Sequence, residues 1–226
     1  MIEVKYIDHM GSDLSVVNAA RVSFGKKSEW VKDKRPYGGA TDGYEEHYDK
    51  VLSERDTKLV KYLAKHKHIS PFGHCFASFH VKAPIFVARQ LVKHKFLRWN
   101  EISRRYVDDE PEFYEPKQWR GRSADKKQGS EGVVNITLDQ ELQSLWHLSI
   151  YKTLLSEGVA PEQARMVLPQ STLTEWYWSG SVDAFSDMAN LRCKEDTQAE
   201  TRVVADQISD QMLELFPVSW EALRDG

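Results

Sequence analysis

The chain has 226 residues, 41% of them hydrophobic and 29% charged, which predicts a single domain with an ordinary apolar core. Its formal net charge of -3 gives no reason to expect general affinity for nucleic acid or for an anionic membrane. Two cysteines, Cys75 and Cys193, are too few for a secreted disulfide scaffold. The N-terminus does not resemble a signal peptide, and no apolar run approaches the roughly 18 residues of a membrane span. We therefore expect a cytoplasmic protein.

Residues 2–65 predict a strand, a helix, a surface insertion and a second helix, in that order. Residues 2–7 alternate apolar and polar side chains, as a half-buried strand does. Residues 13–22 predict a helix with Ser12 as its N-cap. Residues 25–49 are rich in Gly, Lys, Asp and Tyr without a clear period, which indicates a surface insertion in a domain that spans 1–226. Residues 53–65 predict the next helix.

Residues 74–82 are aromatic and β-branched and predict a strand. Pro84 suits the first turn of a helix that runs towards Phe96. This helix can bury one apolar side, made of Phe86, Val87, Leu91 and Val92. Residues 98–132 read as a loop-like stretch.

Residues 138–157 give the strongest helical pattern, and Gly158 is a natural stop. The apolar residues that recur at helical spacing are Leu138, Leu142, Leu145, Trp146 and Leu155. Pro161 opens a short helix that ends before Pro169, and two further helices are expected near 181–192 and 197–216. The order of elements predicts a helix-rich α+β domain with a small, mostly antiparallel sheet rather than a doubly wound one.

The chemistry is concentrated in residues 79–106. On the predicted helix, Arg89, Gln90, Lys93 and His94 form one polar strip. Basic residues continue after it at Lys95, Arg98, Arg104 and Arg105, close to the hydroxyl of Ser103. Such a cluster suits an anion such as a nucleotide phosphate, although basic helical strips are more often simply solvated.

Order and spacing favour the functional interpretation. The run Lys93-His94-Lys95, seven residues and then Ser103 resembles the motif Arg-His-Arg, seven residues, Ser of the flavin-dependent thymidylate synthases. The flanking residues 79–90 and 100–106 match as well. The resemblance extends to 13–24, 66–72, 164–169 and 190–192, and thus over most of the chain.

This resemblance implies an enzyme that methylates dUMP to dTMP with FAD, a methylenetetrahydrofolate carbon donor and NADPH as reductant. It implies a homotetramer with shared active sites and no metal, nucleic-acid or membrane partner. The implied dUMP-binding residues are Arg89, Gln90, Lys93, Glu101, Ser103, Arg104, Arg105, Arg165 and Arg192. The implied FAD-binding residues are Ser23, His68, Ser70, Lys93, His94, Lys95, Glu101, Ser181, Asp183 and Asp187. Arg192 is the implied catalytic residue, a cation that activates the pyrimidine.

Three departures from the family pattern concern the flavin. Lys93 and Lys95 replace arginines, which keeps the charge but loses the planar pair of donors. Asp183 and Asp187 put carboxylates where the family has basic or neutral polar groups, and Gly73 replaces a larger polar residue. We expect weaker or slower flavin handling than in a typical member.

Other interpretations remain open at this point. A non-catalytic nucleotide- or RNA-binding protein could stack bases on Trp99, Tyr106 and Trp119. A degenerate family member could bind dUMP without turnover. A zinc enzyme could use the histidines clustered in sequence, His66, His68, His74 and His80, although no acidic partner has a diagnostic spacing. Ser103 has no assured base that would make it a nucleophile, and neither a P-loop nor a G-x-G-x-x-G fingerprint occurs.

Overall fold

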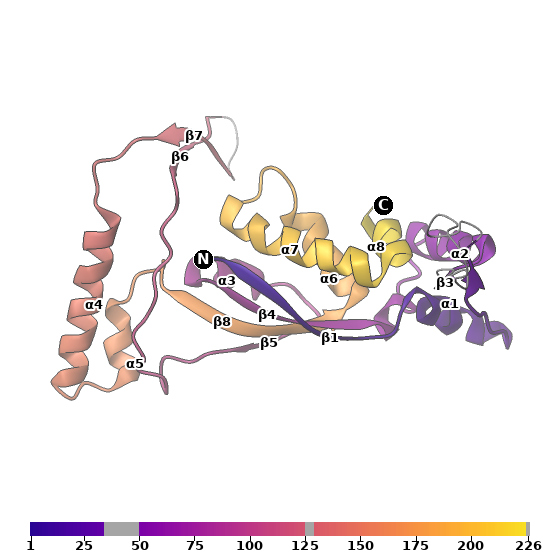
Figure 1. The fold of residues 1–226 in the computed structure, drawn as a ribbon, viewed down its shortest axis with the longest axis horizontal. Helices are drawn as coiled ribbons and strands as arrows, with labels where there is room; N and C mark the ends of the chain where they lie inside the picture. Colours follow the sequence, from indigo (N-terminus) through magenta and orange to yellow (C-terminus); the bar gives the residue numbers. More distant parts are fainter. Residues whose placement is uncertain (34–49, 125–128, 225–226) are drawn as a thin grey trace, which may run out of the picture.

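The structure is a computed structural model that describes residues 1–33, 50–124 and 129–224 (Figure 1). Its centre is a four-stranded sheet in the order β1-β4-β8-β5, with every neighbouring pair antiparallel. These strands are β1 (Glu3–Met10), β4 (Phe76–Pro84), β5 (Leu97–Glu101) and β8 (Leu173–Ser181). Two small antiparallel pairs are formed by β2 (Val31–Lys32) with β3 (Lys50–Val51) and by β6 (Trp119–Arg122) with β7 (Ser130–Val134).

Helices make up the rest of the regular structure and confirm the predicted α+β class. The α-helices are α1 (Asp13–Arg21), α2 (Glu54–Lys65), α3 (Ile85–Leu91), α4 (Gln140–Ser156), α5 (Pro161–Ala164), α6 (Val182–Arg192), α7 (Ala199–Leu215) and α8 (Pro217–Arg224). Short 3-10 turns are η1 (Val22–Phe24), η2 (Phe72–His74) and η3 (Arg165–Val167). None of the helices in the described part of the chain is long and apolar enough to cross a bilayer.

The core lies between one face of the sheet and helices α6 and α7, which run across that face in Figure 1. Alternate residues of β4 and β8 point into it, so that Phe79 and Trp178 are almost fully buried. Both rings meet the ring of Phe185 on α6 edge-on, with centroid distances of 5.3 Å and 5.6 Å. Trp99 of β5 stacks on Trp176 of β8 at 4.3 Å. This aromatic layer fixes the position of α6, whose last residue is Arg192.

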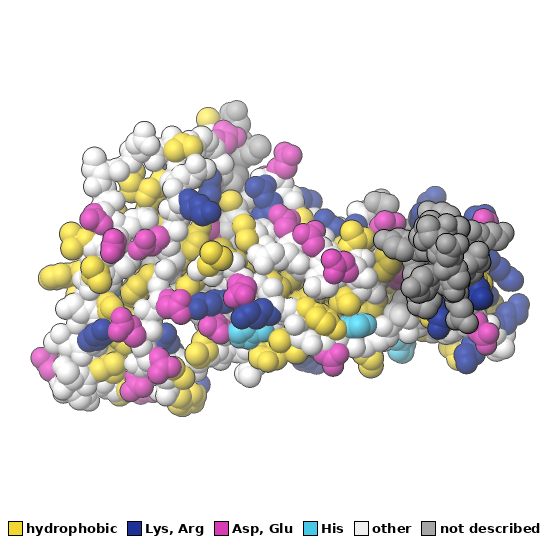
Figure 2. All heavy atoms as spheres, in the orientation of Figure 1, with side chains coloured by type: hydrophobic (Ala, Val, Ile, Leu, Met, Phe, Trp, Pro, Cys, Tyr) yellow, Lys and Arg dark blue, Asp and Glu magenta, His cyan; other side chains and the backbone are white. Residues whose placement is uncertain are grey.

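A second part of the chain, which we call the arm (β6, β7, α4 and α5), projects from one end of the sheet (Figure 1). The predicted helix at 138–157 is confirmed as α4, and Gly158 follows it with a φ of 84°. Its apolar stripe does not enter the core of this chain. Leu142, Leu145 and Trp146 of that stripe are 65%, 54% and 67% exposed, and Leu138, just before the helix, is 55% exposed. Figure 2 shows hydrophobic side chains at the surface over this end of the molecule.

The predicted helix from Pro84 towards Phe96 is wrong beyond Leu91. Strand β5 pairs antiparallel with β8 from Leu97 onwards, so the chain must reverse direction between α3 and β5. Phe96 makes this reversal with a positive φ of 64°, and Val92 is 47% exposed rather than buried. The loop predicted for 98–132 is likewise wrong where β5, β6 and β7 lie.

Strand β8 and helix α8 were absent from the prediction, although both have sequence signals. Strand β8 has the run Leu173-Thr-Glu-Trp-Tyr-Trp178, and α8 begins at Pro217. The predicted first strand and the helices at 13–22, 53–65, 181–192 and 197–216 are confirmed to within a few residues. Of the predicted insertion at 25–49, residues 34–49 lie outside the described residues.

Candidate active site

Arg192 and His94 form the centre of the candidate site. Arg192 Nε donates a 3.0 Å hydrogen bond to His94 Nε2, which lies 98 positions earlier in the turn after α3. Its Nη2 donates at 3.4 Å to the main-chain oxygen of Gln90 in the last turn of α3. The fold therefore brings together three of the predicted site residues from α3, the turn and the end of α6.

The protonation of this group follows from its burial and its charge. Burial and the neighbouring charge of Arg192 lower the pKa of His94 to about 4. Burial also lowers the pKa of Arg192, but a guanidinium remains protonated in proteins. At neutral pH, His94 is thus an uncharged acceptor that orients a fixed cation.

The side chain of Gln90 is held by residues that the sequence interpretation missed. Its Nε2 donates to Gln198 Oε1, and its Oε1 accepts a 3.2 Å hydrogen bond from Thr201 Oγ1. Gln198 Nε2 in turn donates at 3.2 Å to Glu200. These residues surround the start of α7, a few residues after Arg192, and only the predicted helix start near 197 pointed to that region.

The lysines of the predicted motif do not continue a helical strip with Arg89 and Gln90. Only Arg89 and Gln90 belong to α3, whereas Lys93 and Lys95 lie in the turn between α3 and β5. The predicted single strip is therefore wrong, because the helix ends at Leu91. Arg89, Lys93 and Lys95 are exposed, and neither lysine forms an ion pair with a described residue. The turn presents two cations to its surroundings.

The second predicted group lies at the end of β5 and just beyond it. Glu101 accepts hydrogen bonds from Thr174 Oγ1 at 2.7 Å and Trp99 Nε1 at 3.0 Å. Ser103 Oγ accepts from the main-chain N–H of Arg105 at 3.4 Å and from its Nε at 3.3 Å. Within the described residues, no histidine or carboxylate hydrogen-bonds Ser103, so the geometry offers no base for a serine nucleophile.

Other members of the second group have local partners. Arg104 donates to the main-chain oxygen of Asp109, and the Arg105 guanidinium lies 4.9 Å from the centroid of the Tyr106 ring. Trp99 is occupied by its stacking on Trp176, so it is not a free platform for a nucleic-acid base. This weakens the RNA-binding alternative.

A third group surrounds a cavity of about 700 Å³ between α2, α6 and α8. Its lining includes Asp183 and Asp187, which are one turn apart on α6, together with Lys61, Lys65 and Lys67. Both acids therefore face the cavity. Burial, and then the charge of Asp183, raise the pKa of Asp187, while Asp183 Oδ1 is buried without a hydrogen-bond partner among the described residues.

Three other predicted flavin residues are close in sequence to residues that line this cavity, whereas Ser23 is not. His68 and Ser70 are exposed and alternate with the lining residues Lys67 and Ile69. Ser181 is the N-cap residue of α6, two positions before Asp183. Ser23 is exposed in η1, beyond the ion pair that joins Arg21 to Asp56.

Arg165 lies in η3 at the end of the arm. It is exposed, and its Nε donates at 3.2 Å to the main-chain oxygen of Glu162. No hydrogen bond among the described residues joins Arg165, Ser103 or the cavity to the Arg192 group. The predicted residues thus form several separate groups within one chain.

The histidines that suggested zinc are not arranged as ligands. The rings of His66 and His68 have centroids 6.4 Å apart. Across the described residues, no group of three His, Cys, Asp or Glu side chains is placed to hold a metal ion.

The chain is similar along almost its whole length to proteins of one family. The family model described as "Thymidylate synthase complementing protein" matches residues 5–218. A flavin-dependent thymidylate synthase of Thermus thermophilus is 37% identical over 228 residues, covering 98% of this chain and 75% of the relative. One of Thermosipho africanus is 37% identical over 225 residues, covering 97% and 89%.

A solved structure extends the similarity to three dimensions. The UMP/dUMP methylase PolB from Streptomyces cacaoi, bound with 5-Br dUMP, has a TM-score of 0.74 and 29% identity to this chain. The match covers 100% of this chain and 95% of that one. With the family model matching almost the whole length, the chain belongs to the family of flavin-dependent thymidylate synthases.

Proposed function

We propose that this enzyme methylates dUMP to dTMP, with methylenetetrahydrofolate as the carbon donor and NADPH as the reductant. Family membership makes it a flavin-dependent methyltransferase with FAD as its cofactor. The observation that carries the proposal is the Arg192 guanidinium, held by a neutral His94 and the Gln90 carbonyl at the centre of the candidate site.

Arg192 is proposed to act on the pyrimidine. Negative charge develops on the ring when its C6 accepts hydride, and a cation fixed beforehand stabilises that charge without reorganising. His94 can hold Arg192 without competing for the anion, because its own charge is suppressed. Gln90 lies beside this cation and is proposed to bind the same nucleotide.

The dUMP phosphate is proposed to bind the turn at Ser103, Arg104 and Arg105. This turn combines a hydroxyl, main-chain N–H groups and guanidinium donors, which suit a phosphate dianion. Arg165 is proposed to add a second forked donor from the arm. Arg89, Lys93 and Glu101 complete the proposed nucleotide set.

The residues present fit FAD. Lys93 and Lys95 are exposed cations without an ion-pair partner among the described residues, as a pyrophosphate requires. The cavity of about 700 Å³ is large enough for a ring system, and the buried Asp183 oxygen needs a hydrogen-bond donor that a ligand can provide. When bound, FAD supplies the hydride, while the protein supplies position and charge. Ser23, His68, Ser70, His94, Glu101, Ser181 and Asp187 are the other proposed contacts.

A homotetramer with shared sites is proposed for two reasons. First, the nucleotide-binding residues lie in separate groups in one chain, so a complete site needs groups from more than one copy. Second, α4 exposes a continuous apolar stripe, and a stripe of this kind on a helix is normally covered by another helix. A second copy of α4 offers a matching surface.

One assay tests the function against its main alternative. The purified protein is examined for a flavin spectrum and then for dTMP formation from dUMP, methylenetetrahydrofolate and NADPH. Turnover supports the proposal. A protein that binds dUMP and flavin without forming dTMP is the degenerate member, in which the acids at 183 and 187 disturb the flavin. A colourless protein that retains RNA contradicts both.

A further inference from the structure

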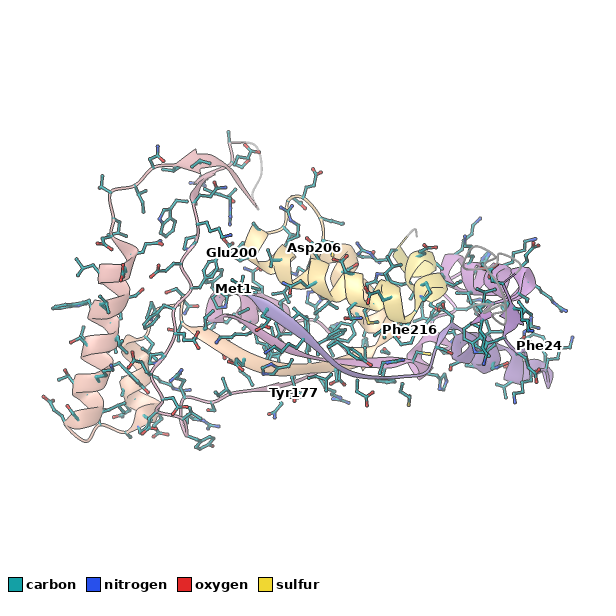
Figure 3. All side chains as sticks on the ribbon, viewed as in Figure 1. Met1, Phe24, Tyr177, Glu200, Asp206 and Phe216 are labelled. Carbon is teal, nitrogen blue, oxygen red and sulfur yellow. The ribbon has the colours of Figure 1, made fainter. Side chains whose placement is uncertain are left out.

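A line of hydrogen bonds joins the arm to the candidate site through a buried acid, Glu200. We infer that Glu200 fixes the amide orientation of Gln90 and is therefore a positioning residue for the nucleotide. The inference rests on the proposed function, because it takes Gln90 as a nucleotide contact. Glu200 lies at the start of α7, where Figure 3 labels it.

Glu200 carries a negative charge that Arg120 stabilises. Glu200 is 5% exposed, and its Oε1 accepts hydrogen bonds from Arg120 Nη2 on β6 at 2.5 Å and from Tyr114 Oη at 3.5 Å. Burial raises the pKa of Glu200, but the hydrogen bond and charge of Arg120 outweigh it, so the pKa lies below its usual value. At neutral pH, Glu200 is a carboxylate, which can only accept hydrogen bonds.

The carboxylate of Glu200 orients the side-chain amide of Gln198. An amide has a donor end and an acceptor end, and only the donor end can face a carboxylate. Gln198 Nε2 accordingly lies 3.2 Å from Glu200 Oε2. The oxygen of Gln198 must then face the other way, towards Gln90.

The Gln198 side chain in turn orients the side-chain amide of Gln90. Because Gln198 offers an oxygen, Gln90 must turn its Nε2 towards it, at 2.5 Å. The Gln90 oxygen then accepts from the fully buried Thr201 hydroxyl at 3.2 Å. The amide nitrogen keeps one N–H that none of these bonds uses.

The orientation of the Gln90 amide matters because Gln90 contacts Arg192 in the candidate site. The main-chain carbonyl of Gln90 accepts a hydrogen bond from Arg192 Nη2, so the residue that carries this amide is anchored to the cation of the candidate site. The unused N–H of the Gln90 side chain can donate to an oxygen atom of a uracil or a phosphate. A reversed Gln90 amide would point an oxygen at those atoms and repel them.

The test uses an isosteric swap, with dUMP binding to the flavin-loaded protein measured by calorimetry. In Glu200→Gln, the acceptor-only group is lost, so Gln198 and Gln90 can both reverse. We expect dUMP to bind about fivefold more weakly, as for the loss of one neutral hydrogen bond. In the double variant Gln198→Glu/Glu200→Gln, the carboxylate at position 198 again accepts from Gln90, while the amide at position 200 can donate to that carboxylate and accept from Arg120. We expect wild-type affinity to return.

The controls separate positioning from general damage. Glu221→Gln, an exposed change on α8, should leave dUMP affinity unchanged, and melting temperatures should show that every variant is folded. Equal dUMP affinity in wild type and Glu200→Gln overturns the inference. So does a double variant that is folded but no better than the single one. If wild type binds no dUMP at all, the proposed function itself is wrong, which is a different result from equal binding by all proteins.

Discussion

Arg192 and His94 are joined by a hydrogen bond in which the histidine is the acceptor. Both side chains are basic, so the contact exists only because His94 gives up its proton. The arrangement lowers the pKa of His94 and holds the Arg192 guanidinium in one orientation. The contact therefore links the protonation state of the candidate site to the stability of the fold.

The stability of the protein should depend on pH through His94. Its folded pKa of about 4 lies below the roughly 6.5 of an unfolded chain, so the unfolded state binds more protons between these values. Folding stability should therefore fall as the pH is lowered through this window. In His94→Asn this contribution is absent, and urea unfolding at a series of pH values should give a flatter profile than wild type. His74→Asn, an exposed change, should keep the wild-type slope. If the free energy of unfolding depends on pH with the same slope in all three proteins, His94 has the same pKa in the folded and unfolded states, which contradicts the prediction.

Arginines at positions 93 and 95 should tighten flavin binding. Lys93 and Lys95 carry charge without the planar fork that pairs two donors with a phosphate. The double variant Lys93→Arg/Lys95→Arg should bind FAD several-fold more tightly in a fluorescence titration, as one or two extra hydrogen bonds of about 1 kcal/mol allow. The matched control is Lys50→Arg/Lys58→Arg, at exposed positions elsewhere. No change in flavin affinity or turnover in the first double variant would count against the proposed role of this turn.

A charge on the apolar stripe of α4 should weaken assembly. Trp146 is 67% exposed and Leu142 65% exposed in a single chain. If other copies cover them, Trp146→Lys or Leu142→Lys must bury an unpaired charge, which costs several kcal/mol. Light scattering should show smaller species for these variants and a tetramer for wild type.

The control for assembly is Glu141→Lys, an exposed change on the same helix. It should leave the mass unchanged. A wild-type monomer at micromolar concentration that still forms dTMP would contradict the proposal of shared sites.

Asp13 should stabilise the junction between α1 and α8. It is 3% exposed, and its two carboxylate oxygens accept 2.9 Å hydrogen bonds from the main-chain N–H groups of Val218 and Ser219. Asp13→Ala leaves both donors unsatisfied near the start of α8 and should lower the free energy of unfolding by about 2 kcal/mol. Asp210→Ala, at an exposed position, should change it by less than about 0.5 kcal/mol in the same urea titration. A similar loss in both variants would contradict the capping role.

The sequence predicts the helices well because their signals are local. Ser12 and Gly158 mark helix ends where the sequence predicts them, and Ser53, predicted as the first helical residue, is the N-cap of α2. It also indicates the segment of Lys93 to Ser103, whose residues are contiguous. The end of α3 could not be predicted in this way, because it is set by the pairing of Leu97 with Gly180, a contact distant in sequence.

The surroundings of Gln90 were hidden for the same reason. Gln198, Glu200 and Thr201 are ordinary polar residues at a helix start, and only the packing of α7 beside α3 brings them to Gln90. For α4, the sequence predicts the helix but not the surface that covers its apolar stripe. Its period predicts a helix, but a period does not reveal whether the covering surface belongs to the same chain.

The most direct test of the account is the turnover of Arg192→Ala. The flavin-loaded variant should fold with a melting temperature within a few degrees of wild type and lose at least about 100-fold in dTMP formation, the loss expected when a charge that stabilises a developing anion is removed. Arg202→Ala, a change on α7 outside the candidate site, should keep most of the activity. A folded Arg192→Ala protein with normal turnover would contradict the central claim that this cation activates the pyrimidine.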